Sequence, residues 1–253
     1  MAEGVEVIRA AALDGVPHGF LGRRGGVSTG VVAGLNAGLG AQDDDEAVAE
    51  NRRRAAAAVM PGAELVTPYQ VHSPDAVIAG EAWSMADRPR ADALVTDRPG
   101  LLLGIVTADC APVLLADKEA GIVGAAHAGW RGAHDGVIAS TIAAMQELGA
   151  EPARICAAIG PCIAQASYEV DTIFRDHFGP DADRFFSTGR PGHSQFDLEA
   201  YVAFRLAECG IGSIERLGLD TYADDARFFS YRRSSHRGEG TYGRQISLIA
   251  LPQ

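Results

Sequence analysis

The sequence predicts an α+β fold, in which strands outnumber helices and the helices come singly. Short runs rich in Val, Ile and Leu recur along the chain and have the length of strands. Many of these runs follow each other after short breaks, which join antiparallel neighbours because parallel strands need a long crossover. The 253 residues are 47% hydrophobic and contain no repeat, linker or composition break. We therefore expect one domain over residues 1–253 with mostly antiparallel or mixed sheets.

The N-terminal part is expected to contain four short strands and one helix. The glycine-dense segment 19–40 is too irregular for a helix, and its glycine spacing matches neither a dinucleotide fingerprint nor a phosphate-binding loop. We expect it to be a loop packed over the sheet. Three aspartates at 43–45 cap a helix that ends before Pro61, and its arginine run 52–54 is interpreted as a solvated face. The strands are expected at 5–8, 64–72, 75–79 and 91–96, with 64–72 and 75–79 forming a hairpin.

Residues 101–134 form the centre of the predicted fold. Three apolar runs, at 101–106, 112–117 and 121–126, are separated by short breaks and are expected to form an antiparallel meander. In such a meander the first and third strands run in the same direction. Cys110 follows the first run and His127 follows the third, so we expect their side chains to lie close together.

The C-terminal part alternates helices and strands. A helical stripe after Asp135, the expected N-cap, stops at Gly149. A second helix over 197–210 would bury Cys209, and residues 168–179 predict a shorter one. Strands are expected at 153–163, 213–219 and 244–251, with a polar, arginine-rich loop over 228–243.

Composition narrows the class of protein. The net charge of −11 argues against a broad nucleic-acid footprint. No apolar run approaches the ~18 residues of a membrane span, and the N-terminus lacks the pattern of a signal peptide. We expect a cytoplasmic protein without nucleic-acid or membrane partners. Its cysteines are then expected to be thiols rather than disulfides; they are Cys110, Cys156, Cys162 and Cys209.

His72, Cys110 and His127 each stand at the end of a predicted strand. Two imidazoles and a thiolate make a reasonable zinc set, and three protein ligands leave the fourth position open, as in catalytic sites. The same donors also suit copper. Two other interpretations remain open: ordinary buried side chains, or a Cys–His hydrolase in which His127 deprotonates Cys110.

Several motifs together resemble the YfiH/laccase-domain family. They are QVHS (70–73), TADCAPVLLAD (107–117), AAHAGWRG (125–132), AAIGPCI (157–163), GFLGRRGGVS and GLN near the start, ENRRR in the first helix and FFSYRR near the end. The matches run from about residue 18 to 250. The resemblance implies a layered α+β fold, with helices flanking the sheets, and a zinc site at His72, Cys110 and His127. It also implies phosphorolysis of adenosine, inosine and methylthioadenosine, with adenosine deamination at the same centre.

The implied reaction assigns further roles. A phosphate dianion calls for arginines, and the candidates are Arg23, Arg24, Arg131 and Arg232, with Arg23 favoured because it matches the arginine of the family's glycine loop. Deamination calls for a carboxylate that shuttles a proton while zinc activates water; Asp109 is the first candidate and Asp92 the second. Either aspartate could instead orient a ligand histidine.

Two alternatives to this enzyme stay open. Older descriptions of the family imply a copper polyphenol oxidase, but the seven histidines are scattered and form no His-X-His pair. A metal-storing or interaction module is the other alternative.

Overall fold

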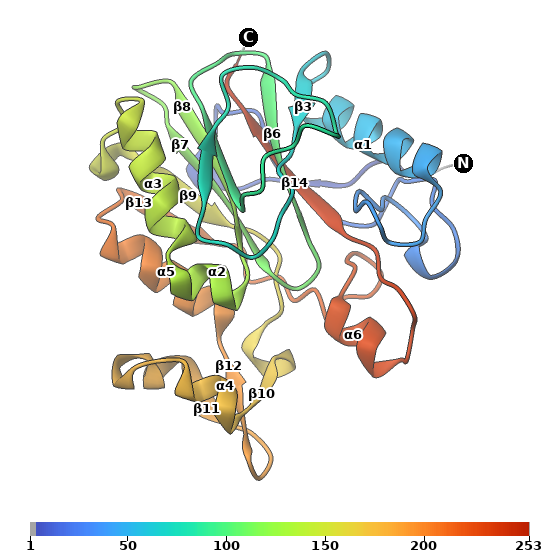
Figure 1. Ribbon diagram of the computed structural model, residues 1–253, viewed down its shortest axis with the longest axis vertical. Coiled ribbons are helices and arrows are strands. Elements are labelled where there is room, and N and C mark those ends of the chain that lie inside the picture. The colour runs from blue at the N-terminus through green and yellow to red at the C-terminus, as the bar shows by residue number, and fades with distance from the viewer. Residues whose placement is uncertain (1–3, 253) are drawn as a thin grey trace.

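The computed structural model describes residues 4–252, without the side chains of 180–182. Two large sheets pack face to face, with helix α1 on the outer face of one and α2, α3 and α5 on the outer face of the other (Figure 1). This arrangement confirms the expected α+β class and its layering. The helices span Asp45–Val59 (α1), Trp130–Asp135 (α2), Val137–Glu147 (α3), Thr172–Asp176 (α4), Leu198–Glu208 (α5) and Tyr231–His236 (α6).

The described strands form three sheets. The five-stranded sheet contains, in order, β1 (Val7–Ile8), β2 (His18–Leu21), β14 (Gln245–Ala250), β6 (Leu101–Thr107) and β3 (Glu64–Val66). The six-stranded sheet contains β13 (Ser213–Arg216), β9 (Cys156–Ile159), β7 (Ala111–Asp117), β8 (Ile122–Ala128), β5 (Ala93–Thr96) and β4 (Ala76–Ile78). A small third sheet of β10 (Glu169–Asp171), β12 (His193–Phe196) and β11 (Phe186–Thr188) projects from the body with α4 (Figure 1).

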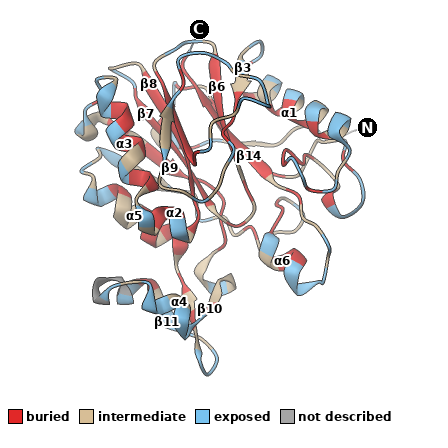
Figure 2. Ribbon diagram, viewed as in Figure 1, coloured by how far each residue is buried: buried red, intermediate tan, exposed pale blue. Residues whose placement is uncertain are grey.

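Strand β6 explains the layering. Leu103 and Ile105 on one face pack into the core between the two large sheets, whereas Leu102 on the other face packs under α1. Strand β7 does the same in its own sheet, with Leu114 facing the other sheet and Val113 facing the helices. The central strands are thus buried on both faces (Figure 2), which is why they are continuous apolar runs rather than alternating ones.

The predicted three-strand meander is wrong in one pairing. Strands β7 and β8 are antiparallel neighbours, as expected, but β6 pairs with β14 and β3 in the other sheet. A run that is apolar on both faces fits either sheet of a sandwich, so the sequence could not assign its partner. The turn at 108–110 therefore carries the chain from one sheet to the other.

Four further expectations are wrong. The hairpin of 64–72 with 75–79 does not form, because β3 lies in one sheet while β4 pairs in parallel with β5 in the other. Asp135 ends α2, and the N-cap of α3 is Gly136, whose left-handed backbone separates the two helices. The predicted loop 228–243 contains α6, and the predicted loop 19–40 overlaps β2.

Both crossings from the five-stranded to the six-stranded sheet occur at the same edge of the sandwich, an edge formed by strand ends. The chain leaves β3 for β4 and β6 for β7 there, because β3 and β6 run in parallel. Strand β8 ends at this edge and β5 begins there, since Ala126 pairs with Ala93. Cys110 and His127 therefore meet, as predicted, because Cys110 directly precedes β7 and the neighbouring Pro112 pairs with His127 of β8 in the six-stranded sheet.

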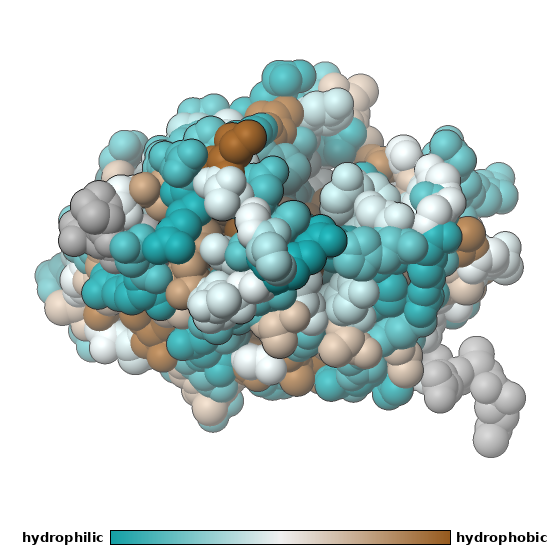
Figure 3. All heavy atoms as spheres, turned by 90° about the horizontal axis from the view of Figure 1, so that it is seen from below, coloured by the Kyte–Doolittle hydropathy of each residue, from teal (hydrophilic) through white to brown (hydrophobic). Residues whose placement is uncertain are grey.

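The face seen from below in Figure 3 is mainly hydrophilic, with hydrophobic residues scattered over it rather than gathered in one large patch. Among the described residues, no helix combines the length and the apolar character needed to cross a membrane.

Candidate metal centre

Three potential metal ligands lie together at the edge where the chain crosses from the five-stranded to the six-stranded sheet. One donor atom each of His72, Cys110 and His127 lie within 4.8 Å of one another. The Cys110 Sγ is 3.9 Å from His72 Nε2, and the two imidazole rings meet edge to face at 4.7 Å between centroids. These donors fit a tetrahedral ion with one open position, so His72, Cys110 and His127 could hold a metal ion.

The backbone around the ligands is specialised. A Cβ atom on Gly129 would lie 2.9 Å from Cys110 Sγ and 3.1 Å from His72 Cδ2, so only glycine leaves room for both side chains. His72 and Asp109 have positive φ angles of 60° and 79°, which are uncommon for residues other than glycine. Such strain is typical of functional sites that the surrounding fold holds in place.

Asp92 is fully buried. It holds two of the potential ligands, His72 and His127, in place through hydrogen bonds. Its Oδ1 is 2.7 Å from His127 Nδ1, so the opposite ring nitrogen, Nε2, is left for a metal. Its Oδ2 accepts hydrogen bonds from the backbone N–H groups of Val71 and Ser73, on either side of His72. Burial opposes ionisation, but the His127 hydrogen bond and charge outweigh it and lower the pKa of Asp92 to about 2.

Cys110 and His127 favour a charged pair when no metal is bound. Burial disfavours both charges, yet the charge of each residue stabilises the other. This mutual stabilisation outweighs burial, so the pKa of Cys110 is lowered to about 6 and the pKa of His127 is raised to about 9. The hydrogen bond with Asp92 also helps to raise the pKa of His127. A thiolate is the form of cysteine that binds metals and attacks electrophiles.

Asp109 holds the neighbouring turn. Its Oδ1 accepts a hydrogen bond from the Thr221 hydroxyl, and its Oδ2 accepts from the Ser230 hydroxyl and the Arg232 backbone N–H at the start of α6. Burial raises the pKa of this carboxyl against the lowering effect of these hydrogen bonds. Both oxygens are thus engaged, and they tie the turn that carries Cys110 to α6.

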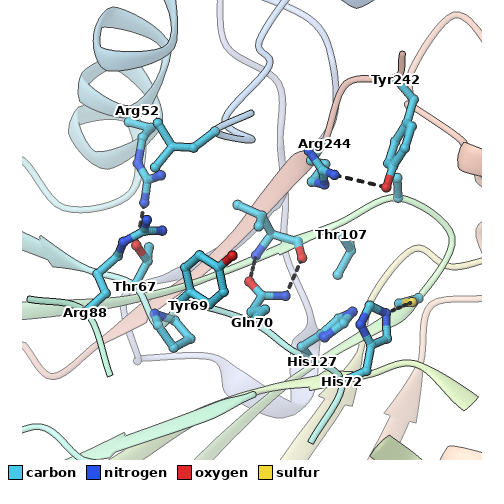
Figure 4. Close-up of a pocket in the computed structure, with 15 residues that line it drawn as sticks. Arg52, Thr67, Tyr69, Gln70, His72, Arg88, Thr107, His127, Tyr242 and Arg244 are labelled. Atoms are coloured by element: carbon cyan, nitrogen blue, oxygen red, sulfur yellow. Dashed lines mark hydrogen bonds between the residues drawn. The ribbon is translucent and has the colours of Figure 1, made fainter. Parts of the chain in front are cut away.

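A cavity of about 280 Å³ opens beside the three ligands (Figure 4). We call it the arginine cavity, because Arg52, Arg88 and Arg244 line it. None of the three has a carboxylate within 4.0 Å in the described part of the chain. Burial, and to a smaller extent the nearby charge of Arg88, lower the pKa of Arg52 to about 10.

Two polar atoms of the arginine cavity are buried without a hydrogen-bond partner among the described residues. They are Arg244 Nη1 and Thr107 Oγ1. Buried polar atoms are rarely left unpaired, and an unpaired one at a cavity wall points to a partner from outside the chain. The cavity is therefore suited to an anion that accepts hydrogen bonds.

Sequence reasoning did not identify these arginines. Arg52 belongs to the run interpreted as a solvated face, but it is buried and donates to the carbonyl of Ala37 and the hydroxyl of Thr67. A sequence signal was present, since Arg52 stands four residues after Val48 and three before Ala55, the spacing of one helix face. Nothing local in the sequence distinguishes Arg88 or Arg244.

The four arginines named from sequence lie in different places. The guanidinium of Arg23 pairs with Asp225 at 2.9 Å in a separate cavity, and Arg24 pairs with Glu6 at 3.5 Å. Arg131 is exposed and covers the ring of Trp130. Arg232 is the member of this set that lines a cavity together with His72 and Cys110.

That second cavity, of about 200 Å³, meets the arginine cavity at His72, Ala108 and Cys110. We call it the aromatic cavity, because Trp130, Tyr168 and Tyr231 line it. The other lining residues are Asp109, Ile163, Leu198 and Arg232. The three potential metal ligands thus lie between a cationic and an aromatic compartment.

Residues 17–252 match the family described as multi-copper polyphenol oxidoreductase laccase. A purine nucleoside phosphorylase of Deinococcus radiodurans is 41% identical over the whole of this chain and 95% of its own, and one of Corynebacterium glutamicum is 37% identical over 92% of this chain and 94% of its own.

Solved structures agree with these sequence matches. YlmD from Geobacillus stearothermophilus superposes with a TM-score of 0.89 at 32% identity, covering 100% of this chain and 98% of its own. A Bacillus licheniformis protein described as YfiH gives a TM-score of 0.89 at 33% identity, with 99% and 97% coverage. The chain therefore belongs to the multi-copper polyphenol oxidoreductase laccase family, as its resemblance to YfiH implied.

Proposed function

We propose that this protein is a zinc-dependent purine nucleoside phosphorylase that acts on adenosine, inosine and methylthioadenosine. One observation carries the proposal: the His72, Cys110 and His127 donors open onto a cavity with three arginines that none of the described carboxylates neutralises. A phosphate dianion needs such a site, because guanidinium groups bind its oxygens in pairs. Relatives named purine nucleoside phosphorylase support the same activity.

The reaction assigns distinct tasks to this site. A phosphate oxygen forms a bond to C1′ of the ribose while the C1′–N9 bond breaks. The electron pair of the C1′–N9 bond leaves with the purine. The proton of hydrogen phosphate ends on the purine, so atoms and charge balance. Arg52 and Arg244 would hold the phosphate in the cavity, and their fixed positive charge would bind it without reorganisation. Zinc, when bound, would supply a Lewis acid.

The hydrogen bonds of Asp92 and Asp109 suit these carboxylates to positioning other groups rather than to transferring a proton. Asp92 accepts from His127 and Ser73, and Asp109 accepts from Thr221, Ser230 and the backbone of α6. A shuttle for deamination needs an oxygen that is free to face the substrate. We therefore propose that both aspartates position the ligands, and that deamination of adenosine is a secondary activity.

The copper oxidase alternative has less support. Chemistry with several coppers needs several ligand clusters, and within residues 4–252 the metal-ligating group found is His72, Cys110 and His127.

The hydrolase alternative has one observation in its favour. Cys110, His127 and Asp92 have the order of a nucleophile, a base and a carboxylate that orients the base. A triad of this kind would not need His72, which stands 3.9 Å from the sulfur. We favour the metal because His72 supplies the third donor.

The phosphorylase proposal is tested with inosine. The zinc-loaded protein should release hypoxanthine and ribose 1-phosphate only when phosphate is present, measured by liquid chromatography. Cys110→Ala should lose both the zinc and the activity, since two remaining ligands hold the ion poorly. Free ribose forming equally fast without phosphate would overturn the proposal.

Alkylation of Cys110 separates a ligand from a nucleophile. Bound zinc should shield the sulfur from iodoacetamide, and chelation should expose it while activity falls. In the chelated protein, the alkylation rate should titrate with a midpoint near pH 6, because the pKa of Cys110 is lowered to about 6 by the charge of His127 despite burial. Fast alkylation without a chelator, with full activity after metal removal, would favour the hydrolase.

A further inference from the structure

The aromatic cavity differs from the arginine cavity in the chemistry of its lining. Trp130, Tyr168 and Tyr231 contribute rings, and Ile163 and Leu198 contribute apolar side chains. A phosphate dianion would gain little there, whereas a flat, neutral, aromatic group could stack on these rings. The cavity must therefore have a different occupant.

The rings of the aromatic cavity are held in place before any ligand binds. Trp130 packs against Phe174 at 4.8 Å between centroids, and Tyr168 packs edge to face on Phe196 at 5.8 Å. The guanidinium of Arg232 lies over the Tyr168 ring at 5.3 Å and donates to the carbonyl of Glu169. Rings fixed in this way lose little conformational entropy when a ligand binds.

Tyr168 also offers an unused polar group. Its side chain is half-buried, and its hydroxyl makes no hydrogen bond to any described residue, unlike that of Tyr222, which is 3.0 Å from His236 Nδ1. A tyrosine hydroxyl at a partly buried wall usually finds a partner. A ligand with ring nitrogens or a carbonyl oxygen would supply the acceptor.

The geometry of displacement links the two cavities. Phosphate approaches C1′ from the side opposite to the departing purine, so the two groups must occupy different compartments with the ribose between them. The arginine and aromatic cavities meet at His72, Ala108 and Cys110, and these are the residues they share. The ribose would then lie at this junction, next to the metal ligands.

We infer that the aromatic cavity binds the purine base, with Trp130 stacking on the ring system and the Tyr168 hydroxyl donating a hydrogen bond to one of its acceptors. This inference rests on the proposed phosphorylase function and adds the compartment and the residues that select a purine. Tyr168 is thereby a specificity-determining residue, while Arg52 acts on phosphate alone.

The sequence provides a convenient reporter, because its two tryptophans are Trp83 and Trp130. In a Trp83→Phe protein loaded with zinc, the emission comes from Trp130 in the aromatic cavity. Hypoxanthine should quench this emission in a saturable way, and inorganic phosphate alone should leave it unchanged. Adding Tyr168→Phe should weaken hypoxanthine binding about three- to tenfold, the effect of one neutral hydrogen bond. The loss of an unpaired hydroxyl should leave the melting temperature unchanged.

Arg52→Gln provides the opposite arm of the test. It should raise the KM for phosphate and leave hypoxanthine binding to the Trp83→Phe protein unaltered. If Arg52→Gln weakens hypoxanthine binding and Tyr168→Phe does not, the purine occupies the arginine cavity and the inference is overturned. Saturable hypoxanthine binding that depends on Tyr168, in a protein without phosphate-dependent turnover, would keep the purine compartment and reject the phosphorylase.

Discussion

Two groups of arginines in this protein have opposite surroundings. Arg23, Arg233 and Arg237 converge on one carboxylate, Asp225, at 2.9 to 3.1 Å. Arg52, Arg88 and Arg244 share a cavity with the three potential metal ligands and have no such partner within the described residues. The first group connects the N-terminal glycine-rich loop to α6, whereas the positive charge of the second group is not neutralised by any described carboxylate.

The difference follows from where the carboxylates are used. At the metal edge, Asp92 is committed to His127 and Ser73, so it neutralises no arginine. At the other group, Asp225 is committed to the arginines themselves. Charge available to a ligand is therefore decided by the partners of an arginine and not by the number of arginines in a motif.

The largest effect is expected from Arg52→Gln. Losing charged hydrogen bonds to phosphate should lower kcat/KM for phosphate about 10- to 100-fold, measured with inosine in excess. The matched control is Arg53→Gln, because Arg53 is the next residue of α1 but is exposed and paired with Glu50. An equal loss in both variants would remove the distinction between paired and unpaired arginines.

Asp92→Asn tests whether the Asp92 carboxylate supports metal binding by orienting His127. Without the charge beside His127 Nδ1, zinc affinity should fall about 10- to 100-fold, measured by competition with a chromogenic chelator. Asp97→Asn is the control, since Asp97 makes a surface pair with Arg98. Unchanged zinc affinity in Asp92→Asn would mean that Asp92 does not orient a ligand.

A change in the paired group should affect stability more than turnover. Arg23→Gln removes the contact with Asp225 and the donors to the Ala33 carbonyl, and we expect the free energy of unfolding to fall by about 1–3 kcal/mol. Urea denaturation measures this, and kcat/KM of the folded variant should stay within about twofold of the parent, about 0.4 kcal/mol. A 100-fold loss of phosphate use in the folded Arg23→Gln protein would restore Arg23 as the phosphate ligand.

The smallest effect is expected from Arg24→Ala and Arg131→Ala. Both side chains lie outside the two cavities beside the metal ligands, and surface substitutions of this kind usually change stability by no more than about 0.5 kcal/mol. Steady-state kinetics with inosine should show less than a twofold change. A clear rise in the KM for phosphate in either variant would extend the anion site beyond the arginine cavity.

The sequence by itself determined much of this protein. Continuous apolar runs predicted the central strands because strands buried on both faces have no polar face to alternate with. Asp44 caps α1 within the predicted aspartate triplet, and a left-handed Gly149 follows α3, because caps and stops are local effects. The motifs around His72, Cys110 and His127 selected the residues that the fold brings to one edge.

The tertiary structure decided the rest. Which sheet receives β6 depends on packing between layers, and a run that is apolar on both faces carries no signal for it. The partners of Arg23 and Arg52 come from segments distant in sequence, at Asp225 and Thr67. Only the folded chain therefore shows that a carboxylate neutralises Arg23, whereas none of the described carboxylates neutralises Arg52. Long-range pairing determines whether an arginine stabilises the fold or remains available to a ligand.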